Sequence, residues 1–413
     1  MANTAFYDDL ETRVPEQREA ALMAALRIQL AHAKAHAPAF ARLLADIGPG
    51  EVVDRRTLAL LPVTRKGELL EQQCAAPPFG GFAAVAPGAL ARIFSSPGPI
   101  YDPEGRAPDY WRMARALYAA GFRAGDVVHN CFSYHLTPAG SMLETGAHAL
   151  GCAVVPGGTG QSEQQVRAIA DLKPAGYVGT PSFLAIILAK AAELGVDLGC
   201  LDKALVSGEA FPAALRERFA ASGIAALQCY ATADIGLIAY ESPAREGLVL
   251  DEGVIVEIVQ PGTGDPVGPG GVGEVVVTTL TADYPLIRFG TGDLSAYLPG
   301  ASPCGRTNHR IKGWMGRADQ ATKVKGMFVQ PAQIAALIKR HKEIIRARLV
   351  VSRDAAGGDV MTLMIEMGEP REDTARIAET LQALTKLRGT VTSVPQGSLP
   401  NDGKVIDDVR KYD

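Results

Sequence analysis

The chain has 413 residues, of which 47% are hydrophobic and 21% charged, a balance typical of globular proteins. A formal net charge of −4 argues against nucleic acid as a partner, and no apolar run approaches the length of a membrane span. The opening segment MANTAFYDDLETRV is acidic and lacks the apolar core of a secretory signal, and six cysteines without a CxxC pair indicate reduced thiols in a cytoplasmic protein.

The N-terminal region predicts one long helix over residues 15–45. Pro15 suits a first helical turn, and Leu22, Leu26 and Leu30 recur at four-residue spacing on one face. We expect this helix to cover the core of a chain that, by its length, holds two or three domains. Lys66, a little further on, is expected at the solvated surface.

The middle of the chain alternates short apolar strands with helices of roughly ten residues, a pattern that predicts a parallel sheet covered on both faces. Ligands of such sheets bind beyond the carboxyl ends of the strands. After a short strand at 91–94 and a loop at 95–105, the predicted helices are 107–120, 140–150, 163–172, 181–194 and 212–221, and the predicted strands are 127–132, 152–155, 177–178, 204–206 and 226–229.

The last third of the chain changes character twice. Between residues 247 and 298 strand-like runs are separated by the glycine-rich PGTGDPVGPGGVG, which suits a small antiparallel sheet or barrel. Its last strand, 285–289, is expected to end in a Gly-Thr-Gly-Asp turn. From Lys323 onwards helices at 331–339 and 371–386 alternate with strands at 347–352, 361–367 and 389–394.

These patterns predict an α/β fold with two domains. The large N-terminal domain, residues 1–318, combines doubly wound βα units at about 60–240 with a β-rich part at about 245–315. The small α+β domain spans residues 319–413.

Three short motifs in the C-terminal part indicate a ligand site. The glycines of GTGD let the backbone approach a ligand, and Asp293 can accept two hydroxyl hydrogen bonds. Gly-Arg-Ala-Asp follows at 316–319, and Gly-Lys ends at Lys404. Alone, each motif is weak, since Asp293 could cap a turn, Arg317 could lie on the surface and Lys404 in a solvated tail. Together and in this order they resemble the motifs of the adenylate-forming enzymes. The segments LIRFGTGDL and GRADQATKVKG are most similar to the phenylacetate-CoA ligase branch.

The resemblance implies roles for these residues. Asp293 would hold the ribose hydroxyls of ATP, and Arg317 would help bind the nucleotide. Asp319 would be the hinge about which the small domain rotates, and Gly326 would line the path of the pantetheine arm of CoA. Lys404 would bridge the acid carboxylate and the α-phosphate during adenylation.

The loop SSPGPIYDPEG stands where the family carries its phosphate loop. Ser95, Ser96 and Gly98 would bind phosphate there, but Pro97 and Pro99 remove backbone donors and no lysine follows. Two interpretations stay open with equal weight: an altered phosphate loop, or a rigid proline turn.

Two further segments match the family at strand ends. SGEAFP resembles its adenine contact, and QCYATAD resembles its Tyr-Gly-x-Ser/Thr-Glu segment, with alanines at Ala231 and Ala233 and an aspartate in place of glutamate. The resemblance implies Mg²⁺ binding by Asp234, a hard oxygen ligand. It implies nucleotide contacts by Gly208, Glu209, Ala210, Tyr230, Ala231 and Thr232.

The segment NCFSYHLTPAG would form the acid pocket, with Tyr134 and Phe132 supplying an apolar slot for an aryl acid, although Phe132 also fits ordinary core packing. His129 and His135 are expected to be structural. Relatives with a structural zinc use positions that here read Ser242, Val249 and Cys304. One thiol does not make a four-ligand site, so no zinc is expected.

The resemblance therefore implies an ATP-dependent ligase that joins an aryl or arylacetic acid to CoA through an acyl-adenylate, with ATP, Mg²⁺ and CoA as cofactors and no nucleic acid or membrane partner. It is compatible with a homodimer and does not name the acid. Two alternatives stay open: an adenylating enzyme with a different acceptor, and a non-catalytic nucleotide- or acyl-CoA-binding homologue with a degenerate phosphate loop.

Overall fold

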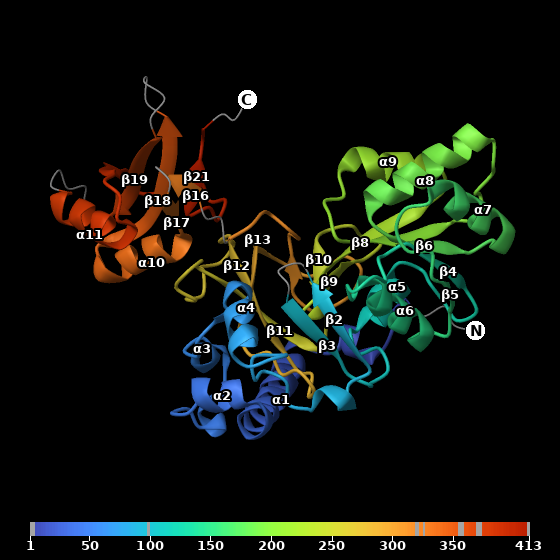
Figure 1. Cartoon of the computed structure of the whole chain (residues 1–413), viewed down its shortest axis with the longest axis horizontal. Helices are drawn as coiled ribbons and strands as arrows, with labels where there is room; N and C mark the ends of the chain where they lie inside the picture. The colour runs from blue at the N-terminus through green and yellow to red at the C-terminus, as the bar shows by residue number, and fades with distance from the viewer. Residues whose placement is uncertain are drawn as a thin grey trace. The chain divides into compact units, whose positions relative to one another are not determined.

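A computed structural model describes residues 5–96, 100–318, 322–324, 327–353, 359–368 and 374–410 (Figure 1). The chain folds into two compact units. The first contains Met1–Val256, Val277–Phe289 and Leu298–Gly313, and the second contains Glu257–Val276, Gly290–Tyr297 and Trp314–Asp413. This division differs from the predicted boundary after residue 318, because two earlier segments group with the C-terminal residues.

The N-terminal region forms two helices, α1 (Pro15–His36) and α2 (Pro38–Leu43), where one helix was predicted. Pro38 lacks a backbone N–H and disfavours a helical conformation at Ala37, which breaks the helix there. The predicted apolar face of α1 is confirmed, since Leu22, Leu26 and Leu30 are buried. The short elements around these helices are η1 (Asp9–Thr12), η2 (Pro49–Glu51), α3 (Arg55–Leu58), β1 (Thr64–Arg65), α4 (Lys66–Ala75) and η3 (Pro87–Ala89).

The first unit is built on the predicted alternation of strands and helices. Its parallel strands are β4 (Val127–Asn130), β5 (Ala153–Val155), β6 (Gly176–Gly179), β7 (Lys203–Val206) and β8 (Ala225–Thr232). The sheet continues with the antiparallel strands β9 (Gly236–Glu241), β10 (Leu248–Leu250) and β15 (Arg310–Ile311), and β14 (Tyr297–Leu298) lies at its edge. The full strand order is β14-β15-β10-β9-β8-β7-β6-β4-β5.

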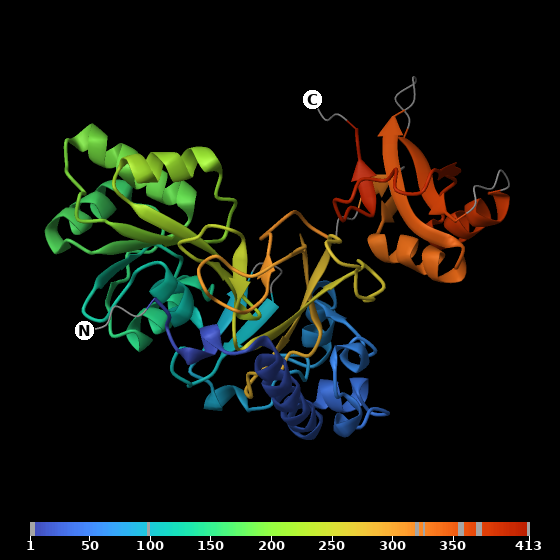
Figure 2. The ribbon, with the colours of Figure 1, turned by 180° about the vertical axis from the view of Figure 1, so that it is seen from behind.

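Helices cover both faces of this sheet, as predicted (Figures 1 and 2). The helices are α5 (Met113–Ala119) and α6 (Ala139–Ala149) on one face, and α7 (Ser162–Leu172), α8 (Pro181–Leu194) and α9 (Ala213–Ala221) on the other. Neighbouring strand residues point to opposite faces: Leu205 packs in the core under α5 and α6, whereas Ala204 and Val206 pack under α7 to α9. The strands are therefore buried on both sides, which is why they read as apolar runs.

Two predicted boundaries differ in this unit. The predicted helix at 107–120 begins only at Met113, because Asp109 and Arg112 adopt left-handed backbone conformations, with φ of 49° and 62°, that precede the helix. Part of the predicted loop at 95–105 is a strand: β2 (Arg92–Ser96) and β3 (Ile100–Glu104) pair antiparallel.

A smaller sheet has the order β1-β13-β12-β11, with β11 (Val254–Val259), β12 (Gly273–Thr279) and β13 (Phe289–Ser295). Here the prediction of a strand at 285–289 followed by a Gly-Thr-Gly-Asp turn is wrong, because the GTGD residues lie inside β13. The carbonyl of Gly292 accepts the N–H of Ala318, and the N–H of Leu294 donates to Gly316. Because these residues are paired, β13 continues through them instead of ending in a turn, with Gly292 at a positive φ of 74°.

The C-terminal part of the second unit is a small α+β layer structure. Its sheet has the order β20-β19-β18-β21 and is covered by α10 (Pro331–Arg340) and α11 (Ala375–Thr385). The strands are β18 (Ile344–Arg353), β19 (Asp359–Met367), β20 (Thr390–Val394) and β21 (Ile406–Asp408), preceded by the pair β16 (Thr322–Val324) and β17 (Met327–Val329). The predicted helices and strands of this part are confirmed apart from shifts at their ends. Within the described ranges, no helix is long and apolar enough to cross a membrane.

His129 predicts a pH dependence of stability. The ring is fully buried, its Nε2 lies 2.7 Å from Gln165 Oε1, and burial lowers the pKa of His129 below its ordinary value of 6.5. The unfolded chain therefore takes up this proton at a higher pH than the folded chain, so stability falls as pH drops below about 6.5, with a slope of at most about 1.4 kcal/mol per pH unit. We expect urea unfolding between pH 7 and pH 5 to show a smaller loss for His129→Gln than for the unmodified chain. The exposed His135→Gln serves as the control, and an equal loss in all three would contradict the prediction.

Candidate active site

Asp293 and Arg317, predicted from separate motifs, meet in the second unit. Arg317 Nη1 lies 3.0 Å from Asp293 Oδ1, and the two residues form an isolated antiparallel bridge. Asp293 is 7% exposed, and its N–H donates to Thr291 Oγ1 at 3.1 Å. Thr291 in turn donates to the carbonyl of Val275 at 2.9 Å. The carboxylate is thus held on a fixed strand, whereas the Arg317 side chain is 42% exposed.

Trp314 joins this cluster, and motif reading missed it. Its Nε1 donates to Asp293 Oδ1 at 3.0 Å, and its ring is 55% exposed. Asp293 Oδ1 therefore receives donors from both Trp314 and Arg317. Two features of the sequence could have indicated Trp314. Tryptophan is rare in this chain, which has two, and Trp314 directly precedes the Met-Gly-Arg run.

Lys404 stands on a tight turn in the same unit. Gly403 has φ 72°, and a Cβ there would lie 2.6 Å from Val272 Cγ1 and 3.2 Å from Leu294 Cδ1. Only glycine fits at position 403 without strain, because the backbone lies so close to Val272 and Leu294. Because Leu294 directly follows Asp293, the turn that carries Lys404 packs against the strand that carries the carboxylate.

The environment of the Lys404 turn is strongly charged. Arg348 pairs with Asp402 and lies 3.5 Å from Asp407, and Lys404 Nζ lies 3.3 Å from Asp407 Oδ1. Burial alone would raise the pKa of Asp402, but the hydrogen bond and charge of Arg348 hold it below its usual value. Lys404 itself is 42% exposed, so its ammonium can reach a ligand at little desolvation cost.

In the first unit, the predicted phosphate-loop serines lie on a β-hairpin. Ser95 and Ser96 pair with Tyr101 and Ile100 across β2 and β3. The N–H of Ser95 donates to the carbonyl of Leu136 at 2.8 Å and is therefore engaged within the protein. Of the other predicted residues, Gly98, the hinge residue Asp319 and the CoA-path residue Gly326 lie outside the described residues, so their roles stay predictions.

Beside this hairpin lies a buried acid pair that the sequence did not predict. Asp102 on β3 is fully buried, and the side chain of Asp234, after β8, is 0% exposed. The carboxyl group of Asp102 is hydrogen-bonded to Ser96 and to Asp234. Burial first, and then the negative charge of Asp234, raise the pKa of Asp102 to about 8.

Lys66 compensates one charge of this pair. Its Nζ lies 2.7 Å from Asp234 Oδ2, and its side chain is 27% exposed. The prediction that Lys66 is a solvated surface residue is wrong, because it pairs with a buried carboxylate 168 positions away in sequence. A carboxylate oxygen is a hard ligand that suits Mg²⁺, so the residue type of Asp234 fits its predicted metal role. No group of three or more His, Cys, Asp or Glu side chains able to hold a metal occurs within the described ranges.

The predicted adenine segments lie at neighbouring strand ends. Gly208, with φ 85°, and Ala210 follow β7, and Glu209 Oε1 accepts the N–H of Ser182 at 2.6 Å in the first turn of α8. This contact gives Glu209 a structural role at a helix N-terminus, where a negative charge is favoured. Tyr230, Ala231 and Thr232 end β8 and pair with β9. Their nucleotide contacts stay predictions.

The predicted acid pocket contains a hydrogen-bonded tyrosine. Asn130 Nδ2 donates to the Tyr134 hydroxyl at 2.8 Å, which donates to Glu144 Oε2 at 2.8 Å. Burial, followed by Glu144, raises the pKa of Tyr134. Phe132 is 7% exposed, belongs to the core under α5 and α6, and its ring faces Gly208, where a Cβ would lie 3.8 Å from it. Phe132 is thus core-packed and also adjacent to the predicted adenine segment.

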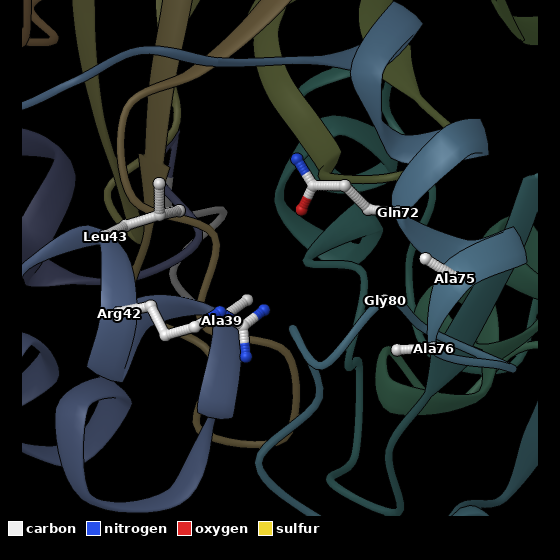
Figure 3. Close-up of a pocket in the computed structure, with 7 residues that line it drawn as sticks. All are labelled: Ala39, Arg42, Leu43, Gln72, Ala75, Ala76 and Gly80. Atoms are coloured by element: carbon white, nitrogen blue, oxygen red, sulfur yellow. The ribbon is translucent and has the colours of Figure 1, made fainter.

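Two surface pockets of the first unit lie away from these residues. One, of about 340 Å³, lies between α2 and α4 and is lined by Ala39, Arg42, Leu43, Gln72, Ala75, Ala76 and Gly80 (Figure 3). The other is lined by residues of α1, Arg55 and 307–309. None of the predicted site residues lines either pocket, so these pockets are not the candidate site.

Cys229 and Cys304 have different environments. Cys229 is buried, and burial raises its pKa to about 12, which fits a structural thiol. Cys304 Sγ lies 3.0 Å from Ser302 Oγ and 3.6 Å from Arg306 Nη1. Burial alone would raise its pKa, but hydrogen bonds from Ser242 and these neighbours lower it.

Comparison with known proteins agrees with this fold. The AMP-binding enzyme family matches residues 109–281. Phenylacetate-coenzyme A ligase from Aromatoleum evansii is 30% identical over 396 residues, which cover 92% of this chain and 88% of the relative. The enzyme of the same name from Thermus thermophilus is 31% identical over 382 residues, covering 88% and 85%. The chain therefore belongs to the phenylacetate-coenzyme A ligase family, which confirms the resemblance inferred from its motifs.

A solved structure supports the fold. The crystal structure of 2-hydroxyisobutyryl-CoA ligase in complex with 2-HIB-AMP and CoA matches with a TM-score of 0.72 at 24% identity, covering 100% of this chain and 94% of that one. The α/β architecture predicted from the sequence is therefore confirmed.

Asp293 provides a direct test of the nucleotide site. Asp293→Ala is expected to weaken binding of AMP by about tenfold to 100-fold, because a hydrogen bond to a charged group contributes roughly 1.5–3 kcal/mol. Titration calorimetry measures this, and the fluorescence of exposed Trp314, bonded to the same carboxylate, gives a second signal. The exposed Asp265→Ala is the control. Equal AMP affinity in both variants would remove Asp293 from the nucleotide site.

Proposed function

We propose that this chain is an ATP-dependent, AMP-forming ligase that converts an aryl or arylacetic acid into its CoA thioester. The observation that carries the proposal is the full-length similarity to phenylacetate-coenzyme A ligases, 30–31% identical over most of both chains. The contact between Asp293 and Arg317 and the fixed turn of Lys404 support it, because each of these residues lies in a motif that resembles one of the family's.

In the first half-reaction, a carboxylate oxygen of the acid attacks the α-phosphorus of ATP. The α,β-bridging P–O bond breaks, pyrophosphate leaves, and an acyl-adenylate remains. Asp293 and Arg317 would fix the nucleotide, and Lys404 would stabilise the negative charge between carboxylate and α-phosphate. Magnesium bound by Asp234 would neutralise phosphate charge.

In the second half-reaction, the CoA thiolate attacks the acyl carbonyl and AMP leaves. We propose that the small domain rotates at Asp319 between the two steps and that the pantetheine arm passes Gly326, where a side chain would block it. Tyr134 and Phe132 would contact the aromatic ring of the acid. We further propose that the ligase works in the cytoplasm and forms a homodimer, which light scattering of the purified protein tests.

The deciding experiment is acid-dependent pyrophosphate release from ATP, measured with a panel of aryl and arylacetic acids, followed by CoA. We expect release with at least one aryl acid, and thioester formation only when CoA is added. Release without any CoA thioester, together with transfer to an amine or another acceptor, would favour an adenylating enzyme with a different acceptor.

The proline-containing loop favours one further candidate. Because Pro97 and Pro99 cannot donate backbone hydrogen bonds to phosphate, a protein that binds AMP or acyl-CoA without catalysis is the alternative. No pyrophosphate release with any acid, alongside calorimetric binding of AMP, would support that candidate and contradict the ligase.

A further inference from the structure

Two arginines of β18 hold the lysine-bearing segment, residues 399–404. Arg346 donates from Nη1 to the carbonyl of Leu399 at 3.1 Å and from Nη2 to the carbonyl of Pro400 at 2.9 Å. Arg348, which is 4% exposed, donates from Nη2 to the same Pro400 carbonyl at 3.2 Å. Because a guanidinium presents its donors in a fixed plane, these bonds fix both the position and the direction of the backbone that they reach.

Two carboxylates complete these contacts. Glu366 on β19 is 1% exposed, and its Oε1 accepts the N–H of Leu399 at 2.7 Å. Asp402 Oδ1 accepts a hydrogen bond from Arg348 and also accepts the N–H of Lys404 at 3.1 Å. A single carboxylate oxygen therefore links the guanidinium of Arg348 to the backbone of Lys404.

Both arginines lie on the face of the small sheet opposite its helices. Neighbouring residues of a strand point to opposite faces, and Leu349 and Val351 of β18 pack in the core with α10 and α11. Arg346 and Arg348 therefore point away from that core, and Glu366 stands directly across from Arg346 on β19. This polar face contacts the lysine-bearing segment, so the segment is held by charged side chains and not by apolar packing of the core.

The same strand also holds the chain that follows Lys404. The carbonyl of Val405 accepts the N–H of Leu349 at 2.9 Å, and β21 then runs parallel to β18 with Ile406 beside Leu349. The backbone is thus fixed on both sides of Lys404, whose side chain is 42% exposed. A lysine side chain has many rotamers, so its backbone must be fixed if the ammonium is to meet a reacting group in one geometry.

We propose that Arg346, Arg348 and Glu366 are positioning residues for adenylation and that they act on it only through Lys404. The inference rests on the proposed ligase function and on the role proposed there for Lys404. Loosening these contacts should leave ATP binding unchanged and slow the formation of the acyl-adenylate, because a charge-stabilising group loses much of its effect when it is displaced.

The first experiment compares acid-dependent pyrophosphate release by Arg348→Met and by the unmodified chain. We expect the maximal rate of Arg348→Met to be at least tenfold lower, with the KM for ATP unchanged. Conversion of a synthetic acyl-adenylate to thioester by CoA should stay normal. The two aspartates that pair with Arg348 have side chains 39% and 25% exposed, so water can solvate them in the variant and the domain should still fold.

Arg410→Met is the matched control. Arg410 follows β21 in the same domain and also pairs with two aspartates, Asp359 and Asp408. It should release pyrophosphate as the unmodified chain does, because its ion pairs lie beyond the lysine-bearing segment. An equal fall in Arg410→Met and Arg348→Met would overturn the inference, since it would show that any loss of an arginine pair in this domain slows the reaction.

A double-mutant cycle separates positioning from general stabilisation. If Arg348 acts only through Lys404, Arg348→Met should lower pyrophosphate release no further when Lys404 is already alanine. A further tenfold fall in that background would overturn the inference, because it would show an effect that does not pass through the lysine. If Arg348→Met does not fold, Arg346→Met replaces it in the cycle, with an expected fall of at least threefold.

Hydrogen exchange gives a readout that needs no turnover. In Arg348→Met, the N–H groups of Leu399 and Lys404 should exchange at least tenfold faster, whereas those of β18 and β19 should exchange as in the unmodified chain. Unchanged exchange at Leu399 and Lys404, or equally faster exchange throughout β18 and β19, would contradict a role confined to the lysine-bearing segment.

The outcomes also separate this inference from the ligase function. Pyrophosphate release that is equal in the unmodified chain and in Arg348→Met would reject the positioning role and retain the ligase. Absence of release by the unmodified chain with every acid would reject the ligase, and the positioning role with it.

Discussion

Lys404→Ala is expected to reduce acid-dependent pyrophosphate release by roughly 100-fold to 1,000-fold, the range found when one preorganised donor to a developing charge is removed. The ammonium would act where the carboxylate and the α-phosphate approach each other, and alanine leaves that charge without a partner. Binding of AMP alone should change little, because Asp293 and Arg317 remain.

Two features make this variant informative. The turn of Lys404 is fixed by Gly403, by the Asp402 side chain and by Arg348, so truncation of the exposed lysine should leave the fold intact. If Lys404 serves adenylation only, a synthetic acyl-adenylate supplied to Lys404→Ala should still be converted to thioester by CoA at a near-normal rate. The exposed Lys342→Ala is the control. Equal pyrophosphate release by both variants would place the catalytic cation elsewhere.

The sequence predicted those features of the fold that depend on the local order of apolar and polar residues. The alternation of strands and helices gave the doubly covered sheet, since periodicity and chain order decide which faces are apolar. Asp293 and Arg317 could both be predicted as site residues, because each lies in a motif that resembles the family's. Only the structure shows that their side chains are 3.0 Å apart. The prediction of a turn at GTGD was wrong. Glycines indicate a turn unless a distant segment, here residues 316–318, forms backbone hydrogen bonds with them.

Charged contacts between residues far apart in the sequence could not be predicted in the same way. No motif indicated a role for Asp102, and Lys66 was expected at the solvated surface. The hairpin, the start of α4 and the end of β8 nevertheless bring Asp102, Lys66 and Asp234 together. No periodic pattern encodes a pairing across 168 positions. Sites made of isolated polar residues from distant segments are therefore where sequence reasoning fails first.

Glu11 is a second such case, and it concerns stability. The N-terminal segment was read only as acidic, but the Glu11 side chain is buried and accepts four donors. These are the Tyr240 hydroxyl at 2.7 Å, Arg115 at 3.3 Å, Arg306 at 3.1 Å and the N–H of Tyr7 at 3.0 Å. The carboxylate thus ties the chain start to β9, α5 and the segment before β15.

Glu11→Ala is expected to lower the free energy of unfolding by about 3–5 kcal/mol, because it removes one partner from a buried ionic network and leaves the charge of Arg306 undercompensated. Arg115 keeps Asp8 and Asp251 as partners, so the loss should fall mainly on the contacts of Arg306 and Tyr240. Urea unfolding at neutral pH measures the change. The exposed Asp9→Ala, two positions away in the same short helix, should change stability by no more than about 0.5 kcal/mol. A loss for Glu11→Ala as small as that for Asp9→Ala would mean that the N-terminal segment does not depend on this network.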